Sequence, residues 1–114
     1  MLRGEIWQVD LDPARGSEAN KRRPAVIVSN DRANAAAVRF DLGVVTVVPV
    51  TSNTEKVYPF QVLLSTDSGL AVDSKAQAEQ VRSVSAQRLS HRVGRVSPAE
   101  LAELDGALKL HLAL

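Results

Sequence analysis

Residues 44–50, Val44-Val45-Thr46-Val47-Val48-Pro49-Val50, form the most strand-like stretch of the chain. Valine and threonine are β-branched, and β-branched side chains favour the extended backbone of a strand. Pro49 cannot donate a hydrogen bond to a neighbouring strand, which predicts an edge position or a bulge near the end of this strand. The residues that follow, TSNTEKVYP at 51–59, predict a polar loop.

Further short strands are predicted on both sides of this stretch. Residues 24–28, PAVIV, are apolar, as expected of a central strand that is covered on both faces and has Pro24 as its first residue. In residues 4–12, GEIWQVDLD, apolar and polar side chains alternate, which indicates a half-buried strand. Residues 60–64, FQVLL, and 92–96, RVGRV, predict two more strands.

A helix is predicted to begin at residues 97–100, Ser-Pro-Ala-Glu. This sequence is a capping box with proline at the first helical position. The helix is amphipathic, because its leucines recur at helical spacing and form one apolar stripe, made of Leu101, Leu104, Leu108 and Leu112. We expect this stripe to cover a core or an interface.

Two segments are less clearly patterned. Asn30 and Asp31 are typical helix caps, so residues 32–38 predict a short helix or a turn, and residues 41–43 predict a turn. Residues 74–84, SKAQAEQVRSV, have the propensity of a helix but also alternate as a strand does. Propensity alone favours the helix here.

These elements predict one compact domain over residues 1–114, a mostly β barrel closed by a C-terminal helix. The chain has no cysteine, so neither a disulfide framework nor a thiolate metal site is expected. No apolar segment is long enough for a signal peptide or a membrane span. We therefore expect a soluble, cytoplasmic protein that binds no membrane.

Positive charge is concentrated in residues 13–23, PARGSEANKRR. Four basic residues against one acidic residue give this segment a net charge of +3, whereas the whole chain carries only +1. Arginine presents five fixed donors that match phosphate geometry, and hydroxyls are available at Ser17, Thr51 and Ser52. The segment is therefore either a phosphate cradle or an ordinary solvated loop, with Thr51 and Ser52 opening a turn.

Several chemistries lack the residues they need. The two histidines, His91 and His111, lie far apart and belong to no metal-binding pattern, so neither a metal nor another cofactor is expected. The chain contains no phosphate-binding glycine loop, no dinucleotide fingerprint and no serine-hydrolase motif. Nucleotide hydrolysis and serine-hydrolase chemistry are therefore poorly supported.

Four segments in order resemble the MazF/PemK family of bacterial toxin endoribonucleases: GEIWQVDLDPARGSE, KRRPAVIVSND, VVPVTSN and AEQVRSV. The resemblance runs from Gly4 through the C-terminal helix. It implies an SH3-like β-barrel of the kind also found in CcdB, a homodimer, and a substrate groove along the dimer interface. It also implies that residues 74–84 are a strand, and we prefer this interpretation because neighbouring strands can override weak helix propensity.

The resemblance assigns roles to individual residues. Arg23, directly before the proline of the second strand, and Thr51 match the family's catalytic residues. Ser17 is expected to hold the substrate phosphate or to orient its loop, and Arg22 and Ser52 to contribute to substrate binding. Gln80 and Arg82 match a strand associated with RNA binding. On the residues alone, Arg23 is equally a loop charge, Thr51 a turn-initiating hydroxyl, and the last two residues a paired strand surface.

The implied reaction is metal-independent, sequence-selective cleavage of single-stranded RNA. The ribose 2′-hydroxyl attacks the adjacent phosphorus and leaves a 2′,3′-cyclic phosphate and a 5′-hydroxyl. Arg23 suits a general acid with an electrostatic role better than a base, because its guanidinium stays protonated, and no general base is evident in the sequence. A cognate antitoxin is the implied inhibitor, with an extended acidic segment that lies in the RNA groove.

Two alternatives remain on the sequence. CcdB-like toxins resemble the same barrel but bind DNA gyrase without cutting RNA, and they act through a C-terminal tryptophan. The only tryptophan here is Trp7, in the first predicted strand, where a core position is expected. A catalytically silent RNA-binding barrel is the second alternative, which the presence of both Arg23 and Thr51 disfavours.

Overall fold

The computed structural model describes residues 1–11, 16, 21–40 and 43–114. In chain order the elements are β1 (Glu5–Asp10), β2 (Arg22–Ile27), α1 (Asp31–Phe40), β3 (Val44–Thr51), β4 (Gln61–Leu64), η1 (Thr66–Ser68), β5 (Ser74–Gln77), η2 (Ala78–Gln80), β6 (Arg82–Ser85), η3 (Ala86–Arg88), β7 (Leu89–Arg95) and α2 (Pro98–Leu112). The three η elements are single turns of 3-10 helix.

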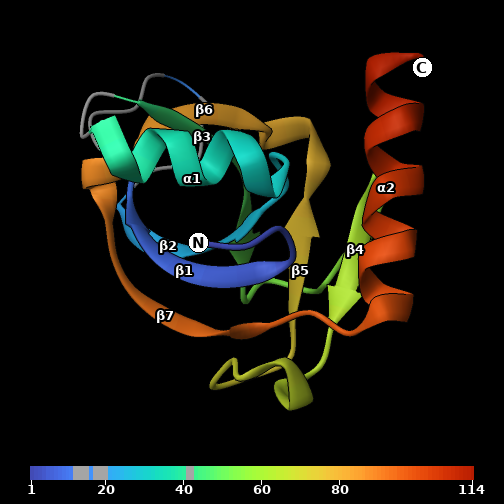
Figure 1. Ribbon diagram of the computed structural model, residues 1–114. Helices are drawn as coiled ribbons and strands as arrows, with labels where there is room; N and C mark the ends of the chain where they lie inside the picture. The colour runs from blue at the N-terminus through green and yellow to red at the C-terminus, as the bar shows by residue number, and fades with distance from the viewer. Residues whose placement is uncertain (12–15, 17–20, 41–42) are drawn as a thin grey trace.

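The described strands form one seven-stranded sheet in the order β4-β5-β3-β2-β1-β7, with β6 also paired to β3. All pairings are antiparallel. The sheet is strongly curved, α1 and α2 lie on different sides of it, and α2 stands beside β4 (Figure 1). The predicted fold class, mostly β with a C-terminal helix, is confirmed. The pairings of the described strands do not close into a ring, so the word barrel describes the curvature of the sheet.

The strand of residues 44–50 lies in the interior of the sheet as β3. On one side it pairs with β2, where Pro49 is opposite Ala25. On the other side its partner changes: β6 pairs with β3 as far as Val47, and β5 pairs with it from Val50 onward. Pro49 stands where the partner changes, and a missing N–H costs least at such a position. The sequence predicted an edge position or a bulge at this point. The edge position is wrong, and the register of β3 with its described neighbours contains no bulge, because the strand instead changes partners here.

β2 is a central strand covered on both faces, as predicted. Ala25 and Ile27 belong to one buried cluster, which includes Ala37 of α1. Val26 belongs to a second cluster, which includes Leu104 of α2. The strand begins at Arg22, two residues before Pro24, so the prediction that Pro24 leads the strand is wrong. This extension places two arginines on a paired strand instead of on a loop.

Both helices have the predicted caps. The side chain of Asn30 accepts a hydrogen bond from the N–H of Ala33, at 2.8 Å, at the start of α1. The capping box of Ser97 and Glu100 is complete at the start of α2. Within the leucine stripe, Leu104 is buried and Leu112 is exposed. Leu101 and Leu108 are partly buried. The stripe covers the core over the first three turns, and the last turn extends beyond it.

Residues 74–84 are neither one helix nor one strand. β5 and β6 are separated by η2, and each strand pairs with a different part of β3. The turn allows the chain to pass from one pairing to the other, and Ala78 within it is buried in the core. The strand prediction is therefore confirmed for residues 74–77 and 82–84 and wrong for residues 78–81.

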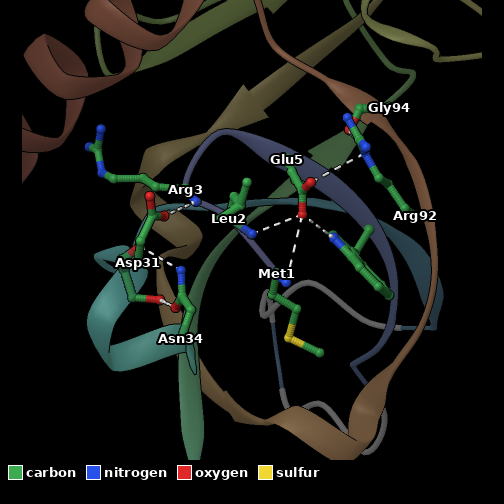
Figure 2. Close-up of polar contacts among 10 residues, drawn as sticks. Met1, Leu2, Arg3, Glu5, Asp31, Asn34, Arg92 and Gly94 are labelled. Carbon is green, nitrogen blue, oxygen red and sulfur yellow. Dashed lines mark hydrogen bonds and ion pairs between the residues drawn. The ribbon is translucent and has the colours of Figure 1, made fainter. Parts of the chain in front are cut away.

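The N-terminus is held by a cluster of polar contacts around the buried carboxylate of Glu5 (Figure 2). One carboxylate oxygen accepts hydrogen bonds from the N–H of Leu2, at 2.8 Å, and from Nε1 of Trp7, at 3.1 Å. The other oxygen lies 3.4 Å from Nε of Arg92 on β7. We call Glu5, Leu2, Trp7, Arg92 and the amino group of Met1 the Glu5 cluster.

Candidate active site

A pocket of about 260 Å³ opens where the start of β2 meets the end of β3. We call it the Arg23–Thr51 pocket. Its described lining residues are basic, hydroxyl-bearing or small and apolar: Lys21, Arg22, Arg23, Pro24, Val50, Thr51, Ser52, Val72 and Ser74. The structure therefore brings together four of the seven predicted site residues, from two segments that are nearly thirty positions apart in the chain. Such a grouping of arginines and hydroxyls is what a phosphate cradle requires.

Strand pairing positions the two arginines. In the register of β1 and β2, Arg23 lies opposite Val9 and Arg22 lies opposite Asp10. Arg23 is half-buried and Arg22 is exposed. Lys21 enters the strand in the left-handed region, with φ 63°, and its carbonyl accepts a hydrogen bond from the N–H of Leu11 at 3.0 Å. The backbone of this basic segment is therefore fixed by β1 from Lys21 onward.

Thr51 is the last residue of β3 and lies opposite Lys75 of β5. Its Oγ1 accepts a hydrogen bond from the N–H of Asn53, at 3.2 Å. This bond engages the hydroxyl as an acceptor, so its hydrogen is directed away from Asn53 and can be donated to a ligand. The prediction that Thr51 begins a turn and the prediction that it serves the site are therefore compatible.

Lys75 is a residue that the sequence analysis missed. Its side chain is buried, its Nζ donates to the carbonyl of Lys56, and it lies 5.9 Å from the centre of the Tyr58 ring. These contacts attach the loop after Thr51 to β5. Val72 and Ser74, which line the pocket, were also missed, because nothing in the spacing of residues 72–75 relates them to Thr51.

Of the three remaining predicted site residues, Ser17 lies outside the described residues, and the other two lie elsewhere. Gln80 belongs to η2, not to a strand, and Arg82 begins β6 opposite Val47. Nη1 of Arg82 lies 3.4 Å from the carbonyl oxygen of Leu11, a long hydrogen bond. Neither Gln80 nor Arg82 lines the Arg23–Thr51 pocket.

A second pocket, of about 510 Å³, borders the first. We call it the Arg88 pocket. Its described lining residues are all polar and come from β1, β2, β6, η3 and β7: Asp10, Arg22, Ser85, Gln87, Arg88 and Ser90. Arg22 lines both pockets, so the two hollows meet at this residue.

Within the described residues there is neither a metal-binding cluster nor a helix suited to a membrane. Residues 1–11, 16, 21–40 and 43–114 hold no group of three or more His, Cys, Asp and Glu side chains placed to bind a metal ion. His91 and His111 are exposed, and His111 packs near the ring of Phe60. Among the helices described, none has the length and apolar character needed to cross a membrane.

The fold and the cationic pocket define a small, mostly β protein whose site suits a phosphate-bearing ligand. Comparison with known proteins makes the assignment specific. The chain belongs to the family of PemK-like, MazF-like toxins of type II toxin-antitoxin systems, whose family model matches residues 2–112.

Three relatives illustrate the match. The chain is 74% identical to Endoribonuclease MazF9 of Mycobacterium tuberculosis (strain ATCC 25618 / H37Rv), over 100% of this chain and 98% of that protein. The crystal structure of MazF (Form-I) from Deinococcus radiodurans matches with a TM-score of 0.84 and 27% identity, covering 100% of this chain and 97% of that chain. An endoribonuclease in complex with its cognate antitoxin, from a mycobacterial species, matches in fold with a TM-score of 0.79 and 24% identity, covering 100% and 96% of the two chains.

The resemblance seen in the sequence is therefore confirmed, and with it the class of protein, an endoribonuclease toxin of the MazF type. The CcdB-like alternative is not favoured. Trp7, the only tryptophan, is partly buried against the core and donates to Glu5, so it has the structural position that we predicted.

Proposed function

We propose that this protein cuts single-stranded RNA at selected sequences, without a metal ion, in the Arg23–Thr51 pocket. The observation that carries the proposal is the convergence of Arg22, Arg23, Thr51 and Ser52 on one pocket. Guanidinium and hydroxyl groups are donors that suit a phosphodiester, and the relative with 74% identity is named an endoribonuclease.

In the proposed reaction the nucleophile belongs to the RNA. The 2′-oxygen forms a bond to the adjacent phosphorus while the bond from phosphorus to the 5′-oxygen breaks. The products are a 2′,3′-cyclic phosphate and a 5′-hydroxyl. Arg23 and Thr51 donate hydrogen bonds to the phosphoryl oxygens that gain charge, and such fixed donors usually contribute more to catalysis than any other feature of sites of this kind.

Two protons must also move. The 5′-oxygen gains one as its bond to phosphorus breaks, and we assign this step to Arg23 as general acid. The 2′-hydroxyl loses the other. The described lining residues of the pocket include neither a histidine nor a carboxylate. In this mechanism the second proton passes to solvent, and the main contribution of the protein is to position and stabilise the transition state.

The proposal includes the partners and the setting of the reaction. The active form is a cytoplasmic homodimer with the RNA groove along its interface. Gln80 and Arg82 contact RNA outside the described lining of the pocket, and Ser17 holds the substrate phosphate or orients its loop. A cognate antitoxin inhibits it by laying an extended acidic segment in the same groove. Lys21, Arg22 and Arg23 provide the complementary charge, and a solved structure of the same fold contains a cognate antitoxin.

The nucleophile provides the sharpest test. A chimeric oligonucleotide with a single deoxyribose on the 5′ side of the cut lacks the attacking hydroxyl, so we expect it to bind and remain intact. The all-ribose strand should be cut in the presence of EDTA, and its 5′ fragment should carry a cyclic phosphate detectable by mass spectrometry. A duplex of the same sequence should resist, because base edges in an A-form helix are poorly accessible.

An oligonucleotide with the deoxyribose one position further from the cut is the matched control, and it should be cleaved normally. Cleavage of the first chimera at the same bond, or a 5′ fragment with a plain 3′-hydroxyl, would contradict the mechanism.

A further inference from the structure

The Arg88 pocket contains chemistry that a phosphate site does not need. Its lining combines two arginines with a carboxylate, an amide and two hydroxyls. The carboxylate of Asp10 accepts hydrogen bonds and repels phosphate oxygens, whereas the amide of Gln87 both donates and accepts. This mixture matches the edge of a nucleobase, where donors and acceptors stand side by side.

The size of the pocket agrees with such a ligand. Its volume of about 510 Å³ falls in the range of pockets that hold small molecules, roughly 300–1,000 Å³, and exceeds the space needed for one base. The neighbouring Arg23–Thr51 pocket, at about 260 Å³, suits a phosphodiester with its ribose.

Hydrogen bonds between separate elements shape the Arg88 pocket. Nη1 of Arg88 donates to the carbonyl of Asp10, at 3.2 Å, and the hydroxyl of Ser90 donates to the carbonyl of Gln8, at 3.3 Å. The side chain of Ser85 accepts from the N–H of Gln87, at 3.3 Å, and caps η3. β1 and the segment from η3 to β7 are thereby held together, so the pocket exists before a ligand arrives, which lowers the entropic cost of binding.

Arg22 connects this pocket to the proposed site of cleavage, because it lines both. An RNA strand whose scissile phosphate lies beside Arg23 and Thr51 therefore places a neighbouring nucleotide at Arg22 and its base in the Arg88 pocket. We propose that the Arg88 pocket reads one base next to the cut, and that Asp10 and Gln87 select a base bearing an amino group. This inference rests on the proposed function, because it assigns the sequence selectivity of the same reaction.

Mapping the cut sites in an RNA library with randomised positions around the cut tests the assignment. We expect the wild-type protein to disfavour uracil, which has no amino group, at one flanking position. Asp10→Asn and Gln87→Ala should reduce the preference at that position by about tenfold, the order expected for one base contact, and leave the other positions unchanged. Gln87 is exposed, so its truncation leaves the core intact.

Asp67→Asn is the matched control, because Asp67 is an exposed carboxylate in η1 and lines neither of the two pockets. It should keep the wild-type preference at every position.

Unchanged preferences in both Asp10→Asn and Gln87→Ala would overturn the inference, as would an equal loss of cleavage at all sequences. Weaker binding of an antitoxin with an unchanged preference would show that the pocket serves a protein partner instead. Failure of the wild-type protein to cut any RNA would overturn the proposed function itself. This result is distinct from failure of the inference about the Arg88 pocket, in which the wild-type protein still cuts RNA.

Discussion

The Glu5 cluster and the Arg23–Thr51 pocket are both polar regions at strand ends, but they contain different partners. In the Glu5 cluster a buried carboxylate meets the amino terminus, an indole N–H and the guanidinium of Arg92. The described lining of the Arg23–Thr51 pocket contains basic groups and hydroxyls but no carboxylate. The first region brings opposite charges together around one carboxylate, whereas the described lining of the second presents basic groups and hydroxyls to a hollow that can receive an anion.

This difference implies a division between stability and function. A buried carboxylate costs free energy unless hydrogen bonds and opposite charges compensate it, so the residues around Glu5 hold β1 and β7 in place. A cluster of like charges destabilises the folded chain slightly and favours an anionic ligand. Substitutions in the two regions should therefore affect different measurements.

The largest expected effect is on cleavage. Arg23→Ala and Thr51→Ala should each lower kcat by roughly 10²–10³, because each removes a donor to the charge that develops on phosphorus. Neither side chain belongs to the buried core, so the free energy of unfolding should change by less than about 0.5 kcal/mol. Cleavage of a fluorogenic RNA and chemical denaturation measure the two quantities on the same samples.

Arg95→Ala is the control for Arg23→Ala, since Arg95 is an exposed arginine near the end of β7 that lines neither pocket of the proposed groove. Its cleavage should match the wild type. Arg23→Lys should remain poor, because an ammonium cannot present two fixed parallel donors. Near-normal cleavage by Arg23→Ala would remove the proposed site.

The second effect, on stability, should occur without a loss of cleavage. Glu5→Gln keeps the size of the side chain but places an amide beside the Arg92 guanidinium and the amino terminus, which have no use for another donor. We expect a loss of about 1–3 kcal/mol in the free energy of unfolding, the range for a disrupted buried hydrogen-bonding group. Denaturation by urea measures it. Glu103→Gln, at an exposed position of α2, should be neutral. A loss of cleavage larger than the loss of stability accounts for would contradict the division between stability and function.

The sequence predicted the local features of the fold well. The capping box at Ser97 and the cap at Asn30 depend on contacts within one helical turn, and both are present. The pairing change on β3 depends on residues far along the chain, in β5 and β6, so the sequence predicted an edge or a bulge at Pro49 instead. The turn at residues 78–80 contains no glycine, proline or asparagine that would signal it.

The composition of residues 13–23 left a phosphate cradle as one of two interpretations, and the resemblance marked the single residues of the site. Arg23 and Thr51 were predicted in this way, and the structure places both in one pocket. The Arg88 pocket has no comparable signal, because Asp10 and Gln87 are far apart in the chain and become neighbours only when β7 pairs with β1. Lys75 was missed for the same reason, since its partner Thr51 lies across a strand pairing.

The third effect depends on pH. Burial raises the pKa of Glu5, but hydrogen bonds from Leu2 and Trp7 and the charges of Arg92 and the amino terminus outweigh it, so the pKa lies below its ordinary value of 4.5. A lowered carboxyl pKa contributes stability that is present above the ordinary value and is lost as the pH falls through the lowered one. The wild-type protein should therefore lose more stability than Glu5→Gln over the pH range below the ordinary value of 4.5. Parallel unfolding curves for the two proteins across that range would contradict the assignment.

The smallest expected effect lies at the entrance to the Arg23–Thr51 pocket. Lys21 adopts φ 63°, a region in which a side chain costs about 1–2 kcal/mol and glycine costs nothing. Glycine also loses more entropy on folding, by roughly 0.5–1 kcal/mol, so Lys21→Gly should be more stable than Lys21→Ala by about 0.5–1 kcal/mol. Both variants lose the same positive charge, so both should cut RNA more slowly than the wild type and at the same rate as each other. At Lys109, within α2, the order must reverse, because glycine weakens a helix relative to alanine. If Lys21→Gly were less stable than Lys21→Ala, the backbone at Lys21 would not be strained. The left-handed conformation of Lys21 would then make no difference to the stability of the Arg23–Thr51 pocket.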